Sequence, residues 1–408
     1  MPRITCLFFS LLLLFALPAE TRGQKALREV KTLLKNKDYK GALQRVQALQ
    51  KDSALSGNTK LYMYGIEANI GLNDIENEKI YLKQSYDTVS FYNSTLGIFT
   101  YTLKSDSCER LKNEDAAAKY RRANFQRLER HYSNLNSAAR FFYKRGRYKE
   151  TMPFLRMYLD YPHTFLGATV GIPETQRHRN NACIYLHCAY ELKDYKEMER
   201  YRDLALRDTD NLKFTYECLV NAAEAESDSV AFQHWLKQGL QHFPDHQPFF
   251  ARLTDYLTDH QDYKAVLELS NAMLQRDSNE VCYRMAQVMA LLNLKQYDEA
   301  IEAAEKTLAL DTALVEMDYG IGLAYIEKAE QVQLPDNAYS KAYKAAKQKQ
   351  RDLYAVAETH LEIYRKARPE SAARWAPLLY KVYLNLNRGT KFAEIERILR
   401  TIDRKSTR

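Results

Sequence analysis

Four positions of the chain repeat at one strict interval, which we call the period. Tyr195, Ser229, Tyr263 and Tyr297 follow one another at this interval, and no insertion falls between them. A period in the range of roughly 20 to 50 residues indicates repeated supersecondary units that bury their apolar faces on one another. This repeat constrains the fold strongly, because each unit needs only its neighbours and not a single globular core.

The apolar residues around these markers follow a helical period. They recur at i, i+3, i+4 and i+7, and no sustained run alternates apolar and polar residues as a half-buried strand does. Only 13 of the 408 residues are glycine and 10 are proline, so we expect no long flexible linkers. The 30 tyrosines fit interfaces between amphipathic helices, because each has an apolar ring and a polar tip. The pattern therefore predicts an all-α chain of helix pairs.

Residues 281–314 form the best-defined unit. Tyr283 and Ala286 lie on its expected first helix, and the segment Gln296-Tyr297-Asp298-Glu299-Ala300 is expected to start its second. With Pro244 near the end of unit 213–246, the units resemble tetratricopeptide repeats, whose period is about 34 residues. The resemblance implies an α-α superhelix, which is a right-handed solenoid of antiparallel helix pairs, with four regular units over residues 179–314.

Outside the regular units the markers are less evenly spaced. Tyr39 and Tyr148 each stand at an expected start of a second helix, and Asn73 stands at a poorer one. The interval from Tyr148 to Tyr195 is longer than one period, so an insertion must lie between them. We therefore predict irregular helical hairpins over 24–161, an interrupting loop over 162–178, and tetratricopeptide-like hairpins with a basic tail over 315–408.

Residues 1–23 have the pattern of a signal peptide. Arg3 precedes an apolar run from Ile4 to Leu17, Pro18 ends that run, and small residues lead to Gly23. We expect cleavage after Gly23, export, and a location in the periplasm or cell envelope. No second apolar stretch of that length follows, so we expect no transmembrane segment in the mature chain.

Catalytic signatures are absent from the sequence. We find no His-Glu-x-x-His motif, no nucleophile elbow and no phosphate-binding loop, and therefore expect neither catalysis nor a cofactor. Cys183 and His187 share a helix face, but Cys188 points about 100° away from His187, so we expect packing residues and no metal site. A bridge between Cys183 and Cys218 is one alternative in an oxidising compartment. The net charge of +8 is modest for this length and does not indicate nucleic acid.

The resemblance also implies where a partner protein or peptide would bind. In tetratricopeptide proteins, side chains at fixed first-helix positions line a concave groove. The groove candidates at the matching positions are Asn180, His187, Tyr190, Phe214, Glu217, Asn221, Glu224 and Asp255, and the same positions continue at Ala251, Met285, Met289 and Leu292. Only Asn221 matches the clamp for a C-terminal carboxylate, so we do not expect that mode. An acidic and apolar groove suits a basic and apolar partner segment.

A basic stretch offers a rival binding surface. Residues 110–149 contain twelve Lys or Arg against three Asp or Glu, interleaved with aromatic residues, and the candidates within it are Arg121, Arg122 and Arg127. Such a face suits an anionic envelope polymer, although solvated helix faces are often charged. The sequence therefore predicts a non-catalytic scaffold that binds a protein partner through the groove, with polymer binding through the 110–149 face as the alternative.

Overall fold

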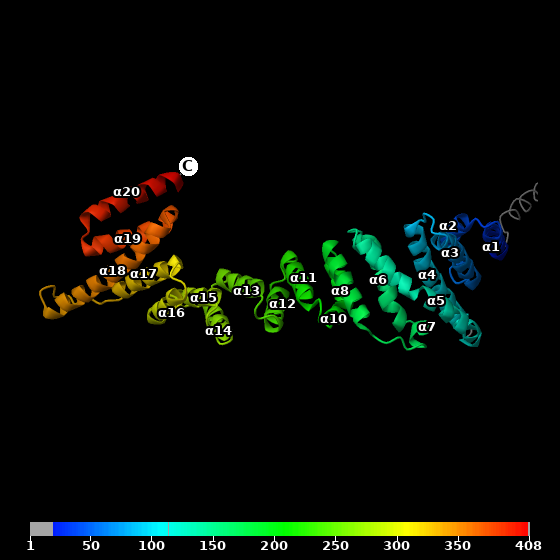
Figure 1. Cartoon of the computed structure of the whole chain (residues 1–408), viewed down its shortest axis with the longest axis horizontal. Helices are drawn as coiled ribbons and strands as arrows, with labels where there is room; N and C mark the ends of the chain where they lie inside the picture. Colours follow the sequence, from blue (N-terminus) through cyan, green and yellow to red (C-terminus); the bar gives the residue numbers. More distant parts are fainter. Residues whose placement is uncertain (1–18, 113, 407–408) are drawn as a thin grey trace, which may run out of the picture. The chain divides into compact units, whose positions relative to one another are not determined.

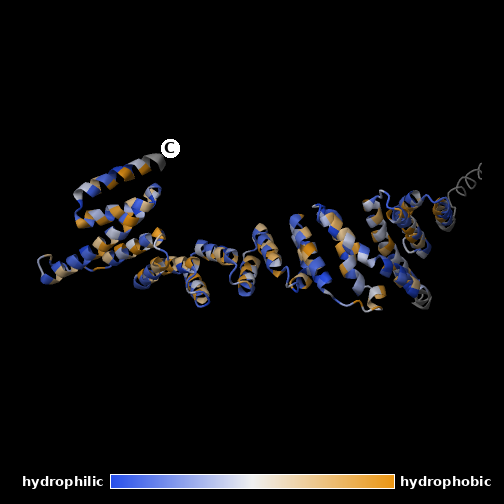
Figure 2. Cartoon of the chain, viewed as in Figure 1, coloured by the Kyte–Doolittle hydropathy of each residue, from blue (hydrophilic) through white to orange (hydrophobic). Residues whose placement is uncertain are grey.

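The computed structural model describes residues 19–112 and 114–406. Within these ranges every regular element is a helix (Figure 1), so the all-α prediction is confirmed for this part of the chain. The chain divides into two compact units, which we call the amino-terminal unit (1–235) and the carboxy-terminal unit (236–408). The longer helices carry both hydrophilic and hydrophobic residues along their length (Figure 2), as expected of helices that bury one face.

The helices of the amino-terminal unit vary in length. They are α1 (Ala19–Lys35), α2 (Tyr39–Leu49), α3 (Thr59–Tyr81), α4 (Thr88–Lys112), α5 (Glu114–Tyr143), α6 (Tyr148–Asp160), α7 (Phe165–Ala168), α8 (Gln176–Glu191), α9 (Tyr195–Met198), α10 (Arg202–Ala205) and α11 (Leu212–Ala225). The next helix, α12 (Ser229–His242), crosses the division between the units.

The carboxy-terminal unit continues with helices joined mostly by short turns. They are α13 (Gln247–Asp259), α14 (Tyr263–Leu274), α15 (Val281–Asn293), α16 (Tyr297–Leu310), α17 (Val315–Glu330), α18 (Lys341–Ala367), α19 (Ala372–Leu386) and α20 (Gly389–Ser406). One apolar cluster of this unit joins α17, α18, α19 and α20 through buried residues such as Tyr354, Leu361, Trp375 and Tyr383.

The periodic markers are the first residues of successive helices. Helices α9, α12, α14 and α16 begin at Tyr195, Ser229, Tyr263 and Tyr297, and each follows a first helix after a short turn. Consecutive helices joined in this way pack as antiparallel hairpins. The predicted pairing of helices is therefore confirmed for α8 with α9, α13 with α14 and α15 with α16.

The turn inside each pair has the same backbone geometry. Lys193, Ser227, Gln261 and Lys295 are also one period apart, and each has a positive φ of 57° to 61°. In the turn before α14, the Asp262 side chain then accepts a hydrogen bond from the Ala265 amide at 3.1 Å. The left-handed residue recurs in all four pairs, and an aspartate caps the second helix in three of them, whereas Gln296 makes no side-chain cap before α16.

Asn73 does not start a helix, and this prediction was wrong. It lies inside α3, where its amide donates to the carbonyl oxygen of Phe91 at 3.0 Å and to Thr95 Oγ1 at 3.1 Å. Both acceptors belong to α4, so Asn73 joins two long helices. Asparagine is a common cap residue, but here it satisfies a buried contact between helices.

The segment predicted as a loop, residues 162–178, contains most of a short 3₁₀ turn (Tyr161–His163), all of α7 and the start of α8. The ring of Phe165 lies near the guanidinium groups of Arg110 and Arg121, at 4.2 and 4.6 Å. Helices α6 and α8 nevertheless pack against each other, so the inserted segment does not interrupt the packing of one helix on the next.

The predicted cleavage site lies near the start of the described chain. Residues 1–18, with the apolar run, are outside the described residues, and α1 extends across Gly23. The signal peptide stays a prediction.

Candidate functional site

A groove in the carboxy-terminal unit brings together residues that are one period apart. Ala251, Met285 and Tyr319 succeed one another at this interval on α13, α15 and α17, and Asp255, Met289 and Leu323 do the same one turn later. All six line one cavity of about 580 Å³. The repeat therefore places equivalent positions of three first helices along a common wall.

The wall of this groove is largely apolar. Met285, Met289 and Leu292 are half-buried, and Val288 and Met317 are fully buried. Methionine side chains are unbranched and adapt to the shape of what they contact. The surface suits apolar side chains of varied shape.

Charged groups also line the groove. Asp255 is exposed. On the elements that follow, Glu316 pairs with Arg368 at 3.2 Å, and the Arg374 guanidinium lies 4.4 Å from the centre of the Tyr319 ring. Arg374 also donates to the Tyr364 hydroxyl at 3.0 Å, which fixes its position. Asp255 is therefore the carboxylate most available to a partner's cation.

One thiol lines the groove. Cys282 is half-buried, and burial together with the nearby Glu280 raises the pKa of its thiol to about 11. A thiol with this pKa is protonated at neutral pH and is a poor nucleophile. The groove thus has the chemistry of a binding surface.

The other seven groove candidates lie in the amino-terminal unit, where the structure brings some of them together. His187 and Phe214 are in ring contact at 5.0 Å, and His187 Nδ1 lies 2.8 Å from the Tyr143 hydroxyl. Tyr148 also contacts the His187 ring, at 5.7 Å. His187 thus lies in an aromatic cluster, with Phe214 exposed at its surface.

The remaining candidates are less closely grouped. Asn180, Tyr190, Glu217 and Asn221 are half-buried, and Glu224 is exposed. Glu217, Asn221 and Glu224 each already interact with another residue. Cys183, which shares a face of α8 with the groove candidate His187, is fully buried, with its sulfur 3.3 Å from Thr215 Oγ1. The predicted groove face of α8 therefore lies partly in the core.

The cysteines of the described chain are free thiols. Cys183 and Cys218 are both buried, and no bridge joins them. No group of three His, Cys, Asp or Glu residues that could hold a metal ion occurs among the residues that the structure describes.

The three basic candidates differ in environment. Arg121 is half-buried and stacks on Phe165, and Arg127 is half-buried and donates to Asn124 Oδ1 at 2.7 Å. Burial lowers the pKa of Arg127 from its usual value. Arg122 alone among the three is exposed, and Arg130 and Arg140 follow it as exposed residues of α5. The exposed cations of α5 are thus available to a ligand, whereas Arg121 and Arg127 contribute to packing.

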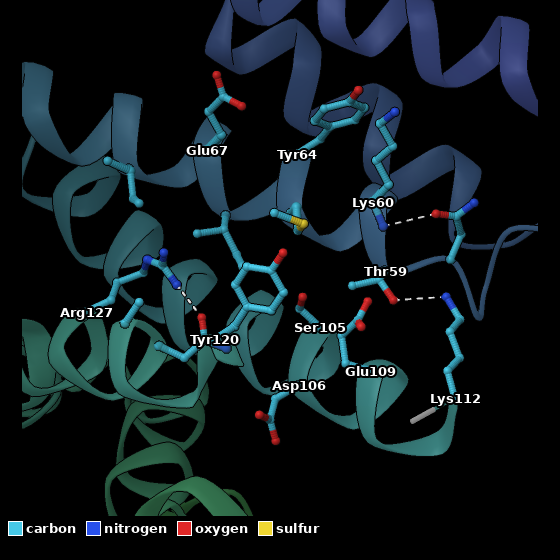
Figure 3. A pocket seen from close by; sticks show the side chains of 16 residues that line it. Thr59, Lys60, Tyr64, Glu67, Ser105, Asp106, Glu109, Lys112, Tyr120 and Arg127 are labelled. Carbon is cyan, nitrogen blue, oxygen red and sulfur yellow. Dashed lines mark hydrogen bonds between the residues drawn. The ribbon is translucent and has the colours of Figure 1, made fainter. Parts of the chain in front are cut away.

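Arg127 lines a second cavity of about 700 Å³ between α3, α4 and α5 (Figure 3). Tyr64 and Glu67 of α3 line it together with Tyr120 and Arg127 of α5. Glu109 lies beside Lys112, whose ammonium donates to Thr59 Oγ1 at 3.0 Å. Because its lining carries both signs of charge, this cavity is not complementary to a polyanion.

The period also predicts groove residues beyond residue 314. Tyr319 and Leu323 lie one period beyond Met285 and Met289, so counting past residue 314 finds them. Glu316 lies one period beyond Cys282, so the same counting finds it. Arg374 has no such signal. Arg374 reaches the groove from α19, and only the packing of α19 on α17 places it there.

Comparisons with known proteins find similar solved structures only. No family model matches the chain, and no curated protein matches it. The TPR domain of P58(IPK) is 13% identical, with a TM-score of 0.26, over 90% of this chain and 98% of that one. Yeast Tom70 is 12% identical, with a TM-score of 0.28, over 89% and 99%. A human IFIT1 dimer with PPP-AAAA is 15% identical, with a TM-score of 0.34, over 80% and 71%.

These TM-scores are low, and the assignment of tetratricopeptide-like repeats rests on the helix register and the repeated turn. Over the described ranges, no helix is both long enough and apolar enough to cross a bilayer.

Proposed function

We propose that the protein is a non-catalytic scaffold of the bacterial cell envelope, which holds a basic and apolar segment of a partner protein in the groove of the carboxy-terminal unit. One observation carries the proposal: residues one period apart on α13, α15 and α17 line a single apolar cavity that also holds an exposed carboxylate. A wall repeated along three helices suits an extended or helical segment more than a compact small molecule.

The size and chemistry of the groove support this occupant. Its volume of about 580 Å³ has room for a few side chains, and a methionine-rich surface accepts more than one apolar shape. A lysine or arginine of the partner would lie near Asp255, which is exposed. The attraction would mainly raise the association rate and would weaken with salt.

The envelope location rests on the sequence alone. The charged start, the apolar run and the exit at Gly23 support export. N-terminal sequencing of protein recovered from the envelope fraction tests this part. A chain that starts near Gln24 is expected, and a mature chain that retains Met1 would contradict it.

Polymer binding through the 110–149 face has weaker support. Of its three candidates, Arg121 and Arg127 are engaged by Phe165 and Asn124, and only Arg122 is exposed. Arg122 with the exposed Arg130 and Arg140 remains as the rival surface.

The test uses defined peptides and matched variants. Fluorescein-labelled peptides of equal length containing leucine and lysine, leucine and glutamate, or serine and lysine are titrated with the protein, and anisotropy is recorded. We expect the leucine–lysine peptide to bind most tightly. Ala251 is exposed in the groove, so Ala251→Trp should fill it and weaken binding at least tenfold. Asp255→Lys should weaken it less, and the loss should shrink as salt rises.

Two residues of α14 supply the controls. Ala272 and Glu268 are exposed there and lie outside the groove, so Ala272→Trp and Glu268→Lys should leave binding unchanged. Equal effects of groove and control variants, or no binding of the leucine–lysine peptide, would contradict the proposal. Loss of binding on Arg122→Glu alone would favour the rival face.

A further inference from the structure

A second surface of the carboxy-terminal unit is both cationic and apolar. We define the basic tip as residues 334–351, which run from the loop after α17 through the first turns of α18. It contains four lysines and one arginine against the single carboxylate of Asp336. It lies outside the groove, so nothing inferred from it depends on the proposed function.

The tip extends beyond the helices that surround the rest of α18. The Gln350 side chain donates to the carbonyl oxygen of Ala329 at 3.1 Å, and Ala329 lies at the end of α17. The part of α18 before Gln350 therefore reaches about 14 Å past α17, at about 1.5 Å per residue. Figure 1 shows this amino end of α18 projecting from the unit.

Four of the five cations of the tip share one side of α18. Lys341, Lys344, Lys347 and Arg351 fall within an arc of about 120°, at about 100° per residue. Lys341, Lys344 and Arg351 are exposed, and Lys347 bonds to the neutral side chain of Gln350. None of the four is paired with a carboxylate among the described residues. The tip thus presents uncompensated positive charge.

The lysines at the start of α18 are electrostatically unfavourable for the helix. The positive end of a helix dipole favours acidic residues in the first turn, and α18 has none there. The Ser340 side chain caps the helix by accepting from the Tyr343 amide at 3.0 Å, so the charges are not needed for its start. Because no contact within the protein compensates for these unfavourable charges, they point to an external binding partner.

Large apolar side chains lie next to these charges. Tyr339 is 90% exposed and Leu334 is 37% exposed. The backbone that carries Tyr339 is held in place, because the Tyr339 amide donates to Asn337 Oδ1 at 3.0 Å. An exposed tyrosine and leucine beside a row of lysines is the arrangement that enters the headgroup region of a bilayer.

We propose that the basic tip docks the protein on an anionic lipid bilayer. Lys341, Lys344, Lys347 and Arg351 would lie over the charged headgroups, and Tyr339 and Leu334 would enter the interface. A soluble polyanion would satisfy the cations but would give the exposed apolar pair nothing to contact. A bilayer, in contrast, would contact both the cations and the exposed apolar side chains of the tip.

The experiment measures sedimentation of the full chain with vesicles. One set contains phosphatidylcholine and phosphatidylglycerol in a seven-to-three molar ratio, and the other contains phosphatidylcholine alone. We expect partitioning onto the anionic vesicles only, weakened by salt. Each basic residue near an anionic surface contributes about 1 kcal/mol, so Lys341→Gln, Lys344→Gln and Arg351→Gln together should lower the partition coefficient about 100-fold.

A matched triple variant controls for net charge. Lys237, Lys264 and Lys295 are exposed lysines of the same unit, and their replacement by Gln should change little. Circular dichroism checks that both triple variants keep their helix content. Equal losses from the two triple variants, or binding to neutral vesicles, would overturn the proposal.

Two variants of Tyr339 separate a bilayer from a polyanion. Tyr339→Ser should weaken vesicle binding about tenfold, because an apolar contact is lost. Tyr339→Trp should show blue-shifted emission and quenching by brominated lipid when vesicles are added. Binding to heparin as tight as binding to vesicles, with no effect of Tyr339→Ser on either, would assign the tip to a soluble polyanion and refute membrane docking.

Discussion

Substitution of Gly97 by alanine should destabilise the amino-terminal unit through one contact between α3 and α4. A methyl group at Gly97 would lie 2.0 Å from Asn69 Oδ1 and 2.4 Å from Asn69 Cγ, well inside contact distance. Asn69 is 2% exposed, and its amide donates to the carbonyl oxygen of Gly65 at 2.7 Å. The side chain cannot move away without losing this hydrogen bond or displacing its neighbours.

The expected loss follows from three terms. Overpacking of a buried contact costs about 1–3 kcal/mol, and loss of a buried hydrogen bond costs about 1 kcal/mol more. Alanine in a helix returns about 1 kcal/mol relative to glycine. The net destabilisation by Gly97→Ala is therefore about 2 kcal/mol, which lowers the urea midpoint by about 1 M if the slope is about 2 kcal/mol/M.

Urea unfolding followed by circular dichroism, with hydrogen exchange to locate the change, measures this effect. Exchange should rise in α3 and α4. Gly389→Ala is the control, because a methyl group there meets nothing within 4 Å and should be neutral or slightly stabilising. In the double variant of Gly97→Ala and Asn69→Ala, the clashing amide is absent. The stability losses of the two single variants should therefore sum to more than the loss of the double variant. Additive losses, or a Gly97→Ala variant as stable as the control, would refute the reasoning.

Three further predictions concern the repeat, a buried histidine and a buried thiol. Deletion of 247–280 removes one full helix pair and should leave a higher melting temperature than deletion of 247–263, which leaves an unpaired helix. Burial lowers the pKa of His178 from 6.5, so its neutral form is favoured in the folded state. The stability that neutral His178 contributes is fully present above pH 6.5 and is lost as the pH falls through the lowered pKa. The melting temperature of His178→Gln should therefore drop less between pH 7 and pH 5 than that of the unmodified protein. Cys188 is fully buried and should resist iodoacetamide in the native protein while reacting in urea.

The regular repeats could be predicted from the sequence because the same short turn recurs once per period. The left-handed residue that ends each first helix recurs once per period, and at Gln261 it is followed by the capping side chain of Asp262. Lysine, serine and glutamine stand at these left-handed positions where glycine is the usual residue, so the residue type alone does not indicate the turn. The same period placed Ala251 beside Met285 and Asp255 beside Met289.

The amino-terminal unit was harder to predict because long helices hide the period. Helix α3 has 23 residues and α5 has 30, so tertiary contacts outweigh the repeat pattern there. The second helix of unit 179–212 breaks after Met198, where Tyr201 donates to Asp160 of α6 at 2.6 Å. Contacts between residues so far apart in the chain leave no local signal in the sequence.

Binding of a partner segment in the groove of the carboxy-terminal unit should protect the thiol of Cys282 from alkylation. Cys282 lines the groove and Cys108 lies in the other unit, and both are half-buried. Alkylation by iodoacetamide at alkaline pH is followed by mass spectrometry, with and without saturating leucine–lysine peptide. We expect the peptide to slow labelling of Cys282 at least fivefold and to leave the rate at Cys108 unchanged. An unchanged rate at Cys282 in the peptide complex would contradict it.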